Sequence, residues 1–287
     1  MSVFLEVSIQ GVLMGLTYAL LALGLTVIFG VMDMVNFAHG EFLMIGMYAA
    51  YLTAAHVFPD PLVGVPVAGL IGLVLGALSY RLLVRRLLQG PTIAQIFGTF
   101  GLMLFLRYGA LAVFGPNLRS APGGLVVGQR LVLGGLVLDG AKVTAAAGSA
   151  LLFALIYWFL QRTRVGLGLR ATAAHREAAR YMGVDTDAMN SIGWAIGGAT
   201  AGMAGALLVN FYYVSPTVGM VFAMITFTTV ALGGFGSVPG AFVAGIIVGV
   251  VEAVTAQYFS PQLKLAVIYL VFFLVVLLRP HGLLGAR

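Results

Sequence analysis

The chain contains 287 residues, of which 61% are hydrophobic and only 8% are charged. Ordinary soluble domains contain roughly 45–50% apolar and about 25% charged residues, so the composition excludes a soluble globular protein. Cysteine is absent, which excludes disulfides, thiolate metal sites and cysteine nucleophiles. The net charge of +6 does not indicate nucleic-acid binding, because the basic residues fall in loops between apolar runs, where membrane topology explains them.

Long uncharged runs predict transmembrane helices. Residues 7–32, 61–80, 143–161 and 188–251 contain no Asp, Glu, Lys or Arg, and a bilayer-spanning helix needs roughly 20 apolar residues. The runs are apolar on every face, whereas the strands of a membrane barrel would alternate between apolar and polar residues. We therefore predict an all-α, polytopic helix bundle that forms a single transmembrane domain over residues 1–287.

Clusters of basic residues orient the predicted spans. Arginines concentrate at 81–86, 162–180 and 279–287, and positive charge marks cytoplasmic loops, so we expect these segments and the C-terminus in the cytoplasm. The loop 115–142 then lies outside. The first apolar run follows no Lys or Arg and precedes no small-residue cleavage site, so it is predicted to be a retained helix and not a signal peptide. The predicted spans are 8–31, 40–58, 62–80, 92–114, 143–161, 188–211, 217–232, 241–258 and 261–278.

Two segments, near 33–41 and 233–240, are predicted to be broken or re-entrant, which makes the total about eight to nine spans. The first brings Asn36, His39 and Glu41 together with no basic residue nearby in the sequence. Buried in the membrane, such a cluster would be a functional site, whereas in a short surface loop it would simply meet water. The second segment is rich in glycine, and pairs of interrupted spans are typical of transport sites. The similarity of the two segments suggests an internal repeat.

Glycine recurs at helix-packing spacing. Small residues four apart let helix backbones approach closely in lipid, so we expect most of these pairs to pack within this bundle. The predicted span 217–232 has 16 residues and reaches only ~24 Å at 1.5 Å per residue, so we expect it to continue into irregular backbone at membrane depth. The glycine pairs are Gly11 with Gly15, Gly72 with Gly76, Gly198 with Gly202, and Gly245 with Gly249.

Two further charged residues lie within or at the end of apolar runs. Glu252 is either a proton-coupling carboxylate or a helix-end residue at the outer interface near Gln257 and Tyr258. Arg107 lies in the span 92–114 and is expected to snorkel or to pair with a carboxylate. Charges at membrane depth are costly unless they are paired, so each residue is a candidate for a defined contact.

The cytoplasmic segment 162–187 predicts a helix between two spans. Residues 172–182 are rich in Ala and other helix formers and precede Gly183, a typical helix stop, so we predict a helix of about three turns. The alternative is a positively charged loop that only sets topology. Orientation alone does not require an ordered helix with a glycine stop, so the pattern favours a docking element.

The chain lacks the sequence motifs of an enzyme. A phosphate-binding loop needs Lys followed by Ser or Thr, but Lys142 precedes Val143 and Lys264 precedes Leu265. The sequence also lacks HExxH, GxSxG and metal-ligand clusters of His and carboxylates. We therefore expect no catalytic residue, no metal site and no cofactor in this chain.

Four blocks of sequence carry a resemblance to a known family. The chain resembles the permease subunits of bacterial branched-chain amino acid ABC importers, specifically the shorter of the two homologous permeases, over essentially its whole length. The blocks are GLTYALLALGLTVIFGVMDMVNFAHGEF at 15–42, GLGLRATAAHREAARYMGVDTD at 166–187, ALGGFGSVPGAFVAGIIVGVVEA at 231–253 and PHGLLG at 280–285.

The resemblance implies an assembly in the bacterial inner membrane. Its other parts would be a second homologous permease, two cytoplasmic ATP-binding subunits that hold ATP and Mg²⁺, and a periplasmic or lipid-anchored substrate-binding protein. The cytoplasmic helix would dock on an ATPase subunit through Arg170, Glu177, Ala178, Ala179, Gly183, Val184 and Asp185. The two broken segments would line the translocation path with Asn36, His39, Gly40, Glu41, Gly234, Gly236, Ser237 and Pro239.

Three functional hypotheses follow. The first is a permease that imports branched-chain or other small neutral amino acids by alternating access, although the same architecture serves urea and short amides. The second is an ion-coupled secondary transporter that acts alone and uses Glu252 or Glu41 as its carboxylate. The third is a structural membrane subunit without a substrate path. The loop 115–142 departs from the family pattern, which leaves binding-protein specificity open.

Overall fold

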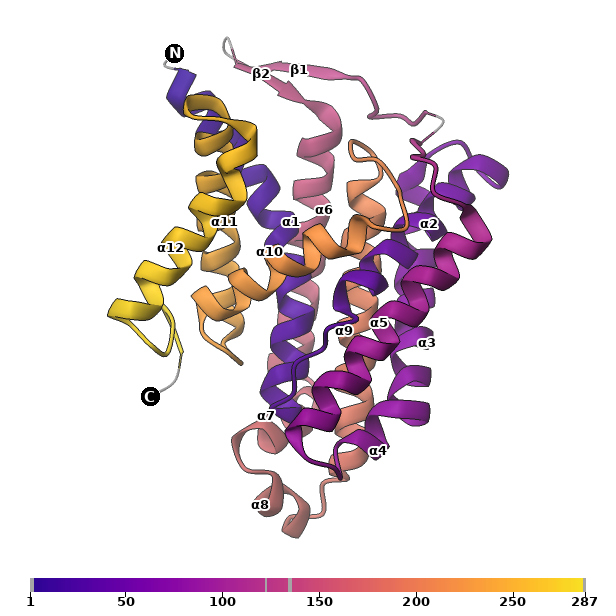
Figure 1. The fold of residues 1–287 in the computed structure, drawn as a ribbon, viewed down its shortest axis with the longest axis vertical. Coiled ribbons are helices and arrows are strands. Elements are labelled where there is room, and N and C mark those ends of the chain that lie inside the picture. Colours follow the sequence, from indigo (N-terminus) through magenta and orange to yellow (C-terminus); the bar gives the residue numbers. More distant parts are fainter. Residues whose placement is uncertain (1–2, 122, 134–135, 286–287) are drawn as a thin grey trace.

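A computed structural model of the protein describes residues 3–121, 123–133 and 136–285. It is a helical bundle with a β-hairpin at one end and the short helix α8 at the other (Figure 1). Within the described ranges, seven helical stretches are long and apolar enough to cross a bilayer, which confirms the predicted all-α polytopic fold. The helices and strands are α1 (Val3–Met32), α2 (His39–His56), η1 (Pro61–Val63), α3 (Gly64–Ser79), η2 (Tyr80–Val84), α4 (Arg85–Leu87), α5 (Thr92–Phe114), β1 (Arg130–Leu133), β2 (Leu136–Asp139), α6 (Gly140–Arg162), α7 (Arg164–Ala174), α8 (Arg176–Tyr181), α9 (Thr186–Leu208), α10 (Val218–Gly233), α11 (Val238–Tyr258), η3 (Pro261–Leu263) and α12 (Lys264–Leu278).

Each of the nine predicted apolar runs forms a helix. The seven stretches that are long and apolar enough to cross a bilayer are α1, η1 to α4, α5, α6, α9, α11 and η3 with α12. The remaining two runs form α2 and the 16-residue α10. Short polar side chains fix several helix starts: Asp139, Asp185 and Ser237 each accept a hydrogen bond from a backbone N–H in the first turn of α6, α9 and α11.

The predicted glycine pairs pack against one another in two antiparallel contacts. Gly11 of α1 lies against Gly249 of α11, where an added Cβ would stand 2.8 Å from the Gly249 carbonyl oxygen. Gly72 of α3 lies against Gly198 of α9, where an added Cβ would stand 2.2 Å from the Gly198 carbonyl oxygen. Such short distances exclude any side chain, so the prediction that small residues bring the helices of this bundle together is confirmed.

These contacts reveal two inverted halves. α1, α2, α3 and α5 alternate in direction through the bundle, and α9, α10, α11 and α12 repeat the same order with the opposite orientation (Figure 1). The first helix of each half packs on the third helix of the other half, α1 on α11 and α9 on α3. The repeat therefore relates the break after α1 to the segment after α9, and not to the segment near 233–240 that the sequence comparison suggested.

The breaks that follow α1 and α9 each return the chain to the middle of the bundle. α1 and α9 cross where Gly24 lies against Gly197 and Thr200. From this crossing each helix continues for eight residues, about 12 Å at 1.5 Å per residue, before it ends. The next helices, α2 and α10, then begin close to the crossing level, because Gly40 in the first turn of α2 packs on Gly219 in the first turn of α10. Irregular backbone flanks α10 on both sides, at 209–217 and at 234–237.

The predicted cytoplasmic segment has a different local structure from the one expected. A single helix over 172–182 is wrong: α7 ends at Ala174, and α8 begins at Arg176. His175 separates them because its extended backbone (φ −159°, ψ 102°) breaks the helix, and its Nδ1 accepts a hydrogen bond from the Ala178 N–H. The stop at Gly183 is confirmed, with φ at +85°. Of the predicted basic clusters, Arg287 lies outside the described residues.

Candidate functional site

The first break places three polar side chains inside the bundle. Asn36, His39 and Glu41 are at most 1% exposed, so the alternative of a surface loop in water is wrong. The Asn36 side-chain oxygen accepts a hydrogen bond from the Ala38 N–H at 3.0 Å, which turns the chain into α2. His39 Nε2 lies 3.0 Å from the carbonyl oxygen of Leu21, in the middle of α1. The side chains thereby fix where α2 starts and at what depth.

Glu41 forms a buried ion pair with Arg107 of α5. The Glu41 Oε1 accepts hydrogen bonds from Nε of Arg107 at 3.0 Å and from its Nη2 at 2.5 Å. Arg107 is only 8% exposed, so of its two predicted alternatives, pairing with a carboxylate is confirmed. Which carboxylate pairs with Arg107 could not be predicted, because 66 residues separate the two partners. A buried charge is stable only when such a partner compensates it.

The N-terminal ends of α2 and α10 meet beside this ion pair. A Cβ added to Gly219 would lie 2.7 Å from the Gly40 carbonyl oxygen and 2.8 Å from Glu41 Oε2. Both helix dipoles therefore direct their positive ends toward the Glu41 carboxylate. Within the described part of the chain, Nδ2 of Asn36, Nδ1 of His39 and Oε2 of Glu41 have no hydrogen-bond partner. Because unsatisfied buried polar atoms are costly, this junction is a candidate functional site.

The second break is a tight turn between α10 and α11. Gly234 and Gly236 adopt φ values of +102° and +78°, which favour glycine, and Ser237 caps α11 by accepting the Gly240 N–H at 3.2 Å. Pro239 occupies the first turn of α11, where its missing N–H costs nothing. The C-terminal segment lies against this turn: the Leu284 N–H donates to the Gly233 carbonyl at 3.0 Å.

The two predicted breaks meet at a cavity of about 630 Å³ on the α7 side of the bundle. The rings of Phe29 and Phe235 pack there in a tilted arrangement with centroids 4.4 Å apart, and Gly30 approaches Gly236 closely. Of the predicted path residues, Gly236 and Ser237 line this cavity, whereas Gly40 and Glu41 lie at the junction of α2 and α10. We call it the inner cavity; its lining is Phe29, Gly30, Asp33, Ala173, Ala174, Phe235, Gly236, Ser237 and Leu284.

The predicted docking residues occupy the end of the molecule beyond the inner cavity (Figure 1). Arg170, Glu177, Ala178, Gly183 and Asp185 are exposed, Val184 is partly buried, and Ala179 is buried. Tyr181 at 87% and Met182 at 84% are the most exposed large hydrophobic residues in the described part of the chain, and neither was predicted as a docking residue. The sequence signal for this docking surface was the pair of large apolar residues at the end of a short polar helix. Large apolar side chains exposed to water often mark a contact with another protein.

Both carboxylates considered for ion coupling are paired with cations. Glu41 contacts Arg107, and Glu252 accepts a hydrogen bond from Lys264 Nζ at 2.7 Å and from the Tyr18 hydroxyl at 2.5 Å. No basic partner of Glu252 was predicted, although Lys264 follows it by only twelve residues. The helical hairpin of α11 and α12 brings the two together.

Comparisons with known proteins identify the family. The family model described as branched-chain amino acid transport system permease component matches residues 8–276. The LivH permeases of the high-affinity branched-chain amino acid transport systems of Salmonella typhimurium and Escherichia coli K12 are each 32% identical, over 98% of this chain and 96% of their own length. The corresponding BraD permease of Pseudomonas aeruginosa is 30% identical over the same shares. No solved structure matches the chain significantly. With the helical bundle, its paired breaks and a match over nearly its whole length, the chain belongs to the family of branched-chain amino acid transport permeases.

Proposed function

We propose that this chain is one of two permease subunits of an ATP-driven importer in the bacterial inner membrane. It carries branched-chain or other small neutral amino acids into the cytoplasm by alternating access. The family membership supports the transport role, and the permeases that it resembles are named for branched-chain amino acids. Two cytoplasmic ATP-binding subunits supply the energy, and a substrate-binding protein delivers the amino acid on the outer side.

The observation that carries this proposal is the exposed tip of α8. Tyr181 and Met182 stand out at 87% and 84% exposure, and the exposed charges of Arg176, Glu177 and Arg180 flank them. A few large apolar side chains within a polar rim are typical of a protein contact. The tip fits into an apolar groove of an ATPase subunit, with the C-terminus of this chain on the same, cytoplasmic side.

The docking element has a direct route to the proposed translocation path. α8 continues from α7 through His175, and Ala173 and Ala174 of α7 line the inner cavity beside Phe235. At its other end the loop is anchored by Asp187, which accepts a hydrogen bond from the Tyr80 hydroxyl at 2.8 Å and pairs with Arg85 at 3.1 Å. Closure of the ATPase subunits would therefore move α7 against the two breaks and change the width of the inner cavity.

The test is a purification of the tagged chain in mild detergent from its own host, followed by mass spectrometry of the proteins that accompany it. We expect two ATPases with phosphate-binding loops and a second polytopic permease. Recovery of the folded, monodisperse chain alone, together with proton-dependent uptake by that purified chain, would contradict the proposal and establish a secondary transporter.

A pair of variants localises the contact. Tyr181→Ser combined with Met182→Ser should reduce ATPase recovery at least tenfold, because it removes the apolar anchors without changing the membrane bundle. The matched control combines Leu118→Ser and Leu125→Ser, two side chains of the opposite end that are 69% and 73% exposed, and should leave recovery unchanged. Equal recovery with both variants would show that α8 is not the docking element.

A further inference from the structure

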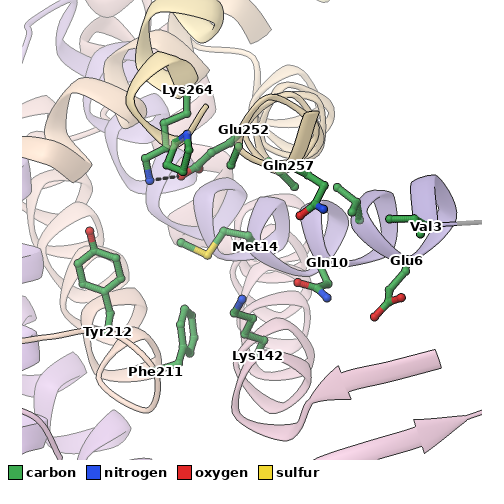
Figure 2. A pocket seen from close by; sticks show the side chains of 15 residues that line it. Val3, Glu6, Gln10, Met14, Lys142, Phe211, Tyr212, Glu252, Gln257 and Lys264 are labelled. Atoms are coloured by element: carbon green, nitrogen blue, oxygen red, sulfur yellow. Dashed lines mark hydrogen bonds and ion pairs between the residues drawn. The ribbon is translucent and has the colours of Figure 1, made fainter. Parts of the chain in front are cut away.

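A second cavity, of about 530 Å³, lies between α1, α6, α11 and α12 (Figure 2). The starts of α1 and α6, which help to line it, lie at the end of the bundle opposite the docking helix α8 (Figure 1). The cavity is enclosed by the start of α1, the start of α6, the end of α11, the start of α12 and the segment after α9. We call it the outer cavity. It shares no lining residue with the inner cavity. Val3 at its rim is 57% exposed, so it is reached from the side where α1 begins.

The outer cavity carries balanced charges of both signs. Its lining includes two lysines, Lys142 and Lys264, and two glutamates, Glu6 and Glu252. Lys264 and Glu252 neutralise each other through their 2.7 Å ion pair. Lys142 extends from α6 into the cavity, and Glu6 lies along α1 on the same side (Figure 2). In the part of the chain that the structure describes, neither forms an ion pair, so one cation and one anion are available to a ligand.

Apolar side chains adjoin these charges. Met14 of α1 and Phe211, after α9, lie next to Lys142 in the wall of the cavity (Figure 2). Binding pockets for small molecules combine such an apolar wall with a few polar groups that fix orientation. The ligand that matches one cation, one anion and an apolar wall is a zwitterion with an aliphatic side chain. A lining of net positive charge would instead be expected for the phosphate of a lipid headgroup.

The position of the outer cavity is also suitable for a ligand that binds before it is translocated. Beneath it α1 and α11 are in direct backbone contact, with Gly15 against Gly245, and the inner cavity adjoins the far end of the same helix pair. The hydroxyl group of Tyr18 in α1 donates a hydrogen bond to Glu252 of α11, which adds a polar contact between the two helices. The packed contact between α1 and α11 thus separates a ligand in the outer cavity from the inner cavity.

We propose that the outer cavity is a loading site for an aliphatic zwitterionic amino acid. Its carboxylate pairs with Lys142, its ammonium group faces Glu6, and its side chain packs on Met14 and Phe211. This inference rests on the proposed import function and assigns that function an entry site in this chain.

The absence of cysteine in the natural sequence allows a site-specific test. In the complete importer, reconstituted in phospholipid nanodiscs with its partner subunits, Ala256→Cys places a thiol in the lining of the outer cavity. We expect L-leucine to slow labelling of this thiol by a membrane-impermeant maleimide at least fivefold. Isopentylamine, which lacks the carboxylate, and 4-methylpentanoate, which lacks the ammonium group, should not protect at the same concentration. Leu118→Cys, an exposed outer position away from the cavity, should label equally with and without L-leucine.

Charge variants complete the test. Adding Lys142→Ala to Ala256→Cys should raise the L-leucine concentration that gives half protection about tenfold, and Lys142→Arg should restore most of the protection. Uptake of labelled leucine is measured in parallel. Leucine uptake without protection of the thiol would overturn the loading site and leave the proposed function intact. The absence of both uptake and protection would overturn the loading site and the proposed function. Protection by added anionic phospholipid instead of leucine would also overturn the loading site and identify a lipid site.

Discussion

At the scale of single residues, the unusual feature is a complete ion pair inside an apolar bundle. Glu41 and Arg107 come from α2 and α5, and both are nearly inaccessible to solvent. Their pairing holds the first turn of α2 against the neighbouring helix, next to the meeting point of α2 and α10. Removing one partner leaves an isolated buried charge, which costs far more than removing both.

We therefore predict that Arg107→Ala destabilises the protein by about 3–5 kcal/mol, because Glu41 is left buried without its partner. Combining Arg107→Ala with Glu41→Gln should recover a large part of this loss. The measurement is a double-mutant cycle on thermal unfolding in detergent. Strictly additive effects of the two substitutions would show that the pair does not form.

At the scale of elements, the contact between α1 and α11 depends on glycine. A Cβ at Gly249 would stand 2.3 Å from the Gly11 carbonyl oxygen, so Gly249→Ala must push the two helices apart. We expect a loss of about 1–3 kcal/mol of stability from this overpacking. Gly109→Ala in α5 is the control, since nothing lies within 4 Å of its added Cβ and alanine favours helix by up to about 1 kcal/mol. If Gly249→Ala and Gly109→Ala had the same unfolding temperature, this result would contradict the close packing of α1 on α11.

A second prediction at this scale concerns the turn at Gly183, which follows α8. Gly183 has φ at +85° with no atom within 4 Å of an added Cβ, so a substitution there acts through backbone conformation alone. Gly183→Val should cost about 1–2 kcal/mol locally and reduce uptake by misplacing α8, while the bundle stays folded. Gly183→Asn tolerates this conformation and should keep most of the uptake. Normal uptake and normal ATPase recovery with Gly183→Val would contradict the proposal that α8 docks on an ATPase subunit.

At the scale of the whole molecule, the two inverted halves interlock. Because α1 packs on α11 and α9 packs on α3, the main helix contacts join one half to the other. The chain between α5 and β1 is a loop in which Leu125 is 73% exposed. A protease site inserted at 125–128 and then cut should leave both fragments together in mild detergent. Fragments that separate without a denaturant would show that the contacts between the halves are weaker than this architecture requires.

Much of this architecture could be predicted from the sequence, and particular residues show where prediction stopped. The apolar runs fixed the nine helices, and the bounds of α5 agreed at both ends. The 16-residue run that became α10 correctly indicated irregular backbone next to this helix. His175 was not recognised as a helix break, because a six-residue helix and its cap carry little periodic signal. Tyr181 and Met182 were missed because their exposure is known only once the neighbouring helices are placed.

The sequence by itself determined that the chain is a helical membrane protein, where its spans lie, which end of it is positively charged and which family it belongs to. These properties follow from composition, hydrophobic run length and local motifs, all of which act over short stretches of chain. Only the tertiary structure decided which glycine pairs meet, that Glu41 pairs with Arg107, and that two cavities lie at opposite ends of α1 and α11. Those contacts join residues that are dozens to hundreds of positions apart, and in lipid their choice depends on close packing and charge compensation, not on a pattern along the chain.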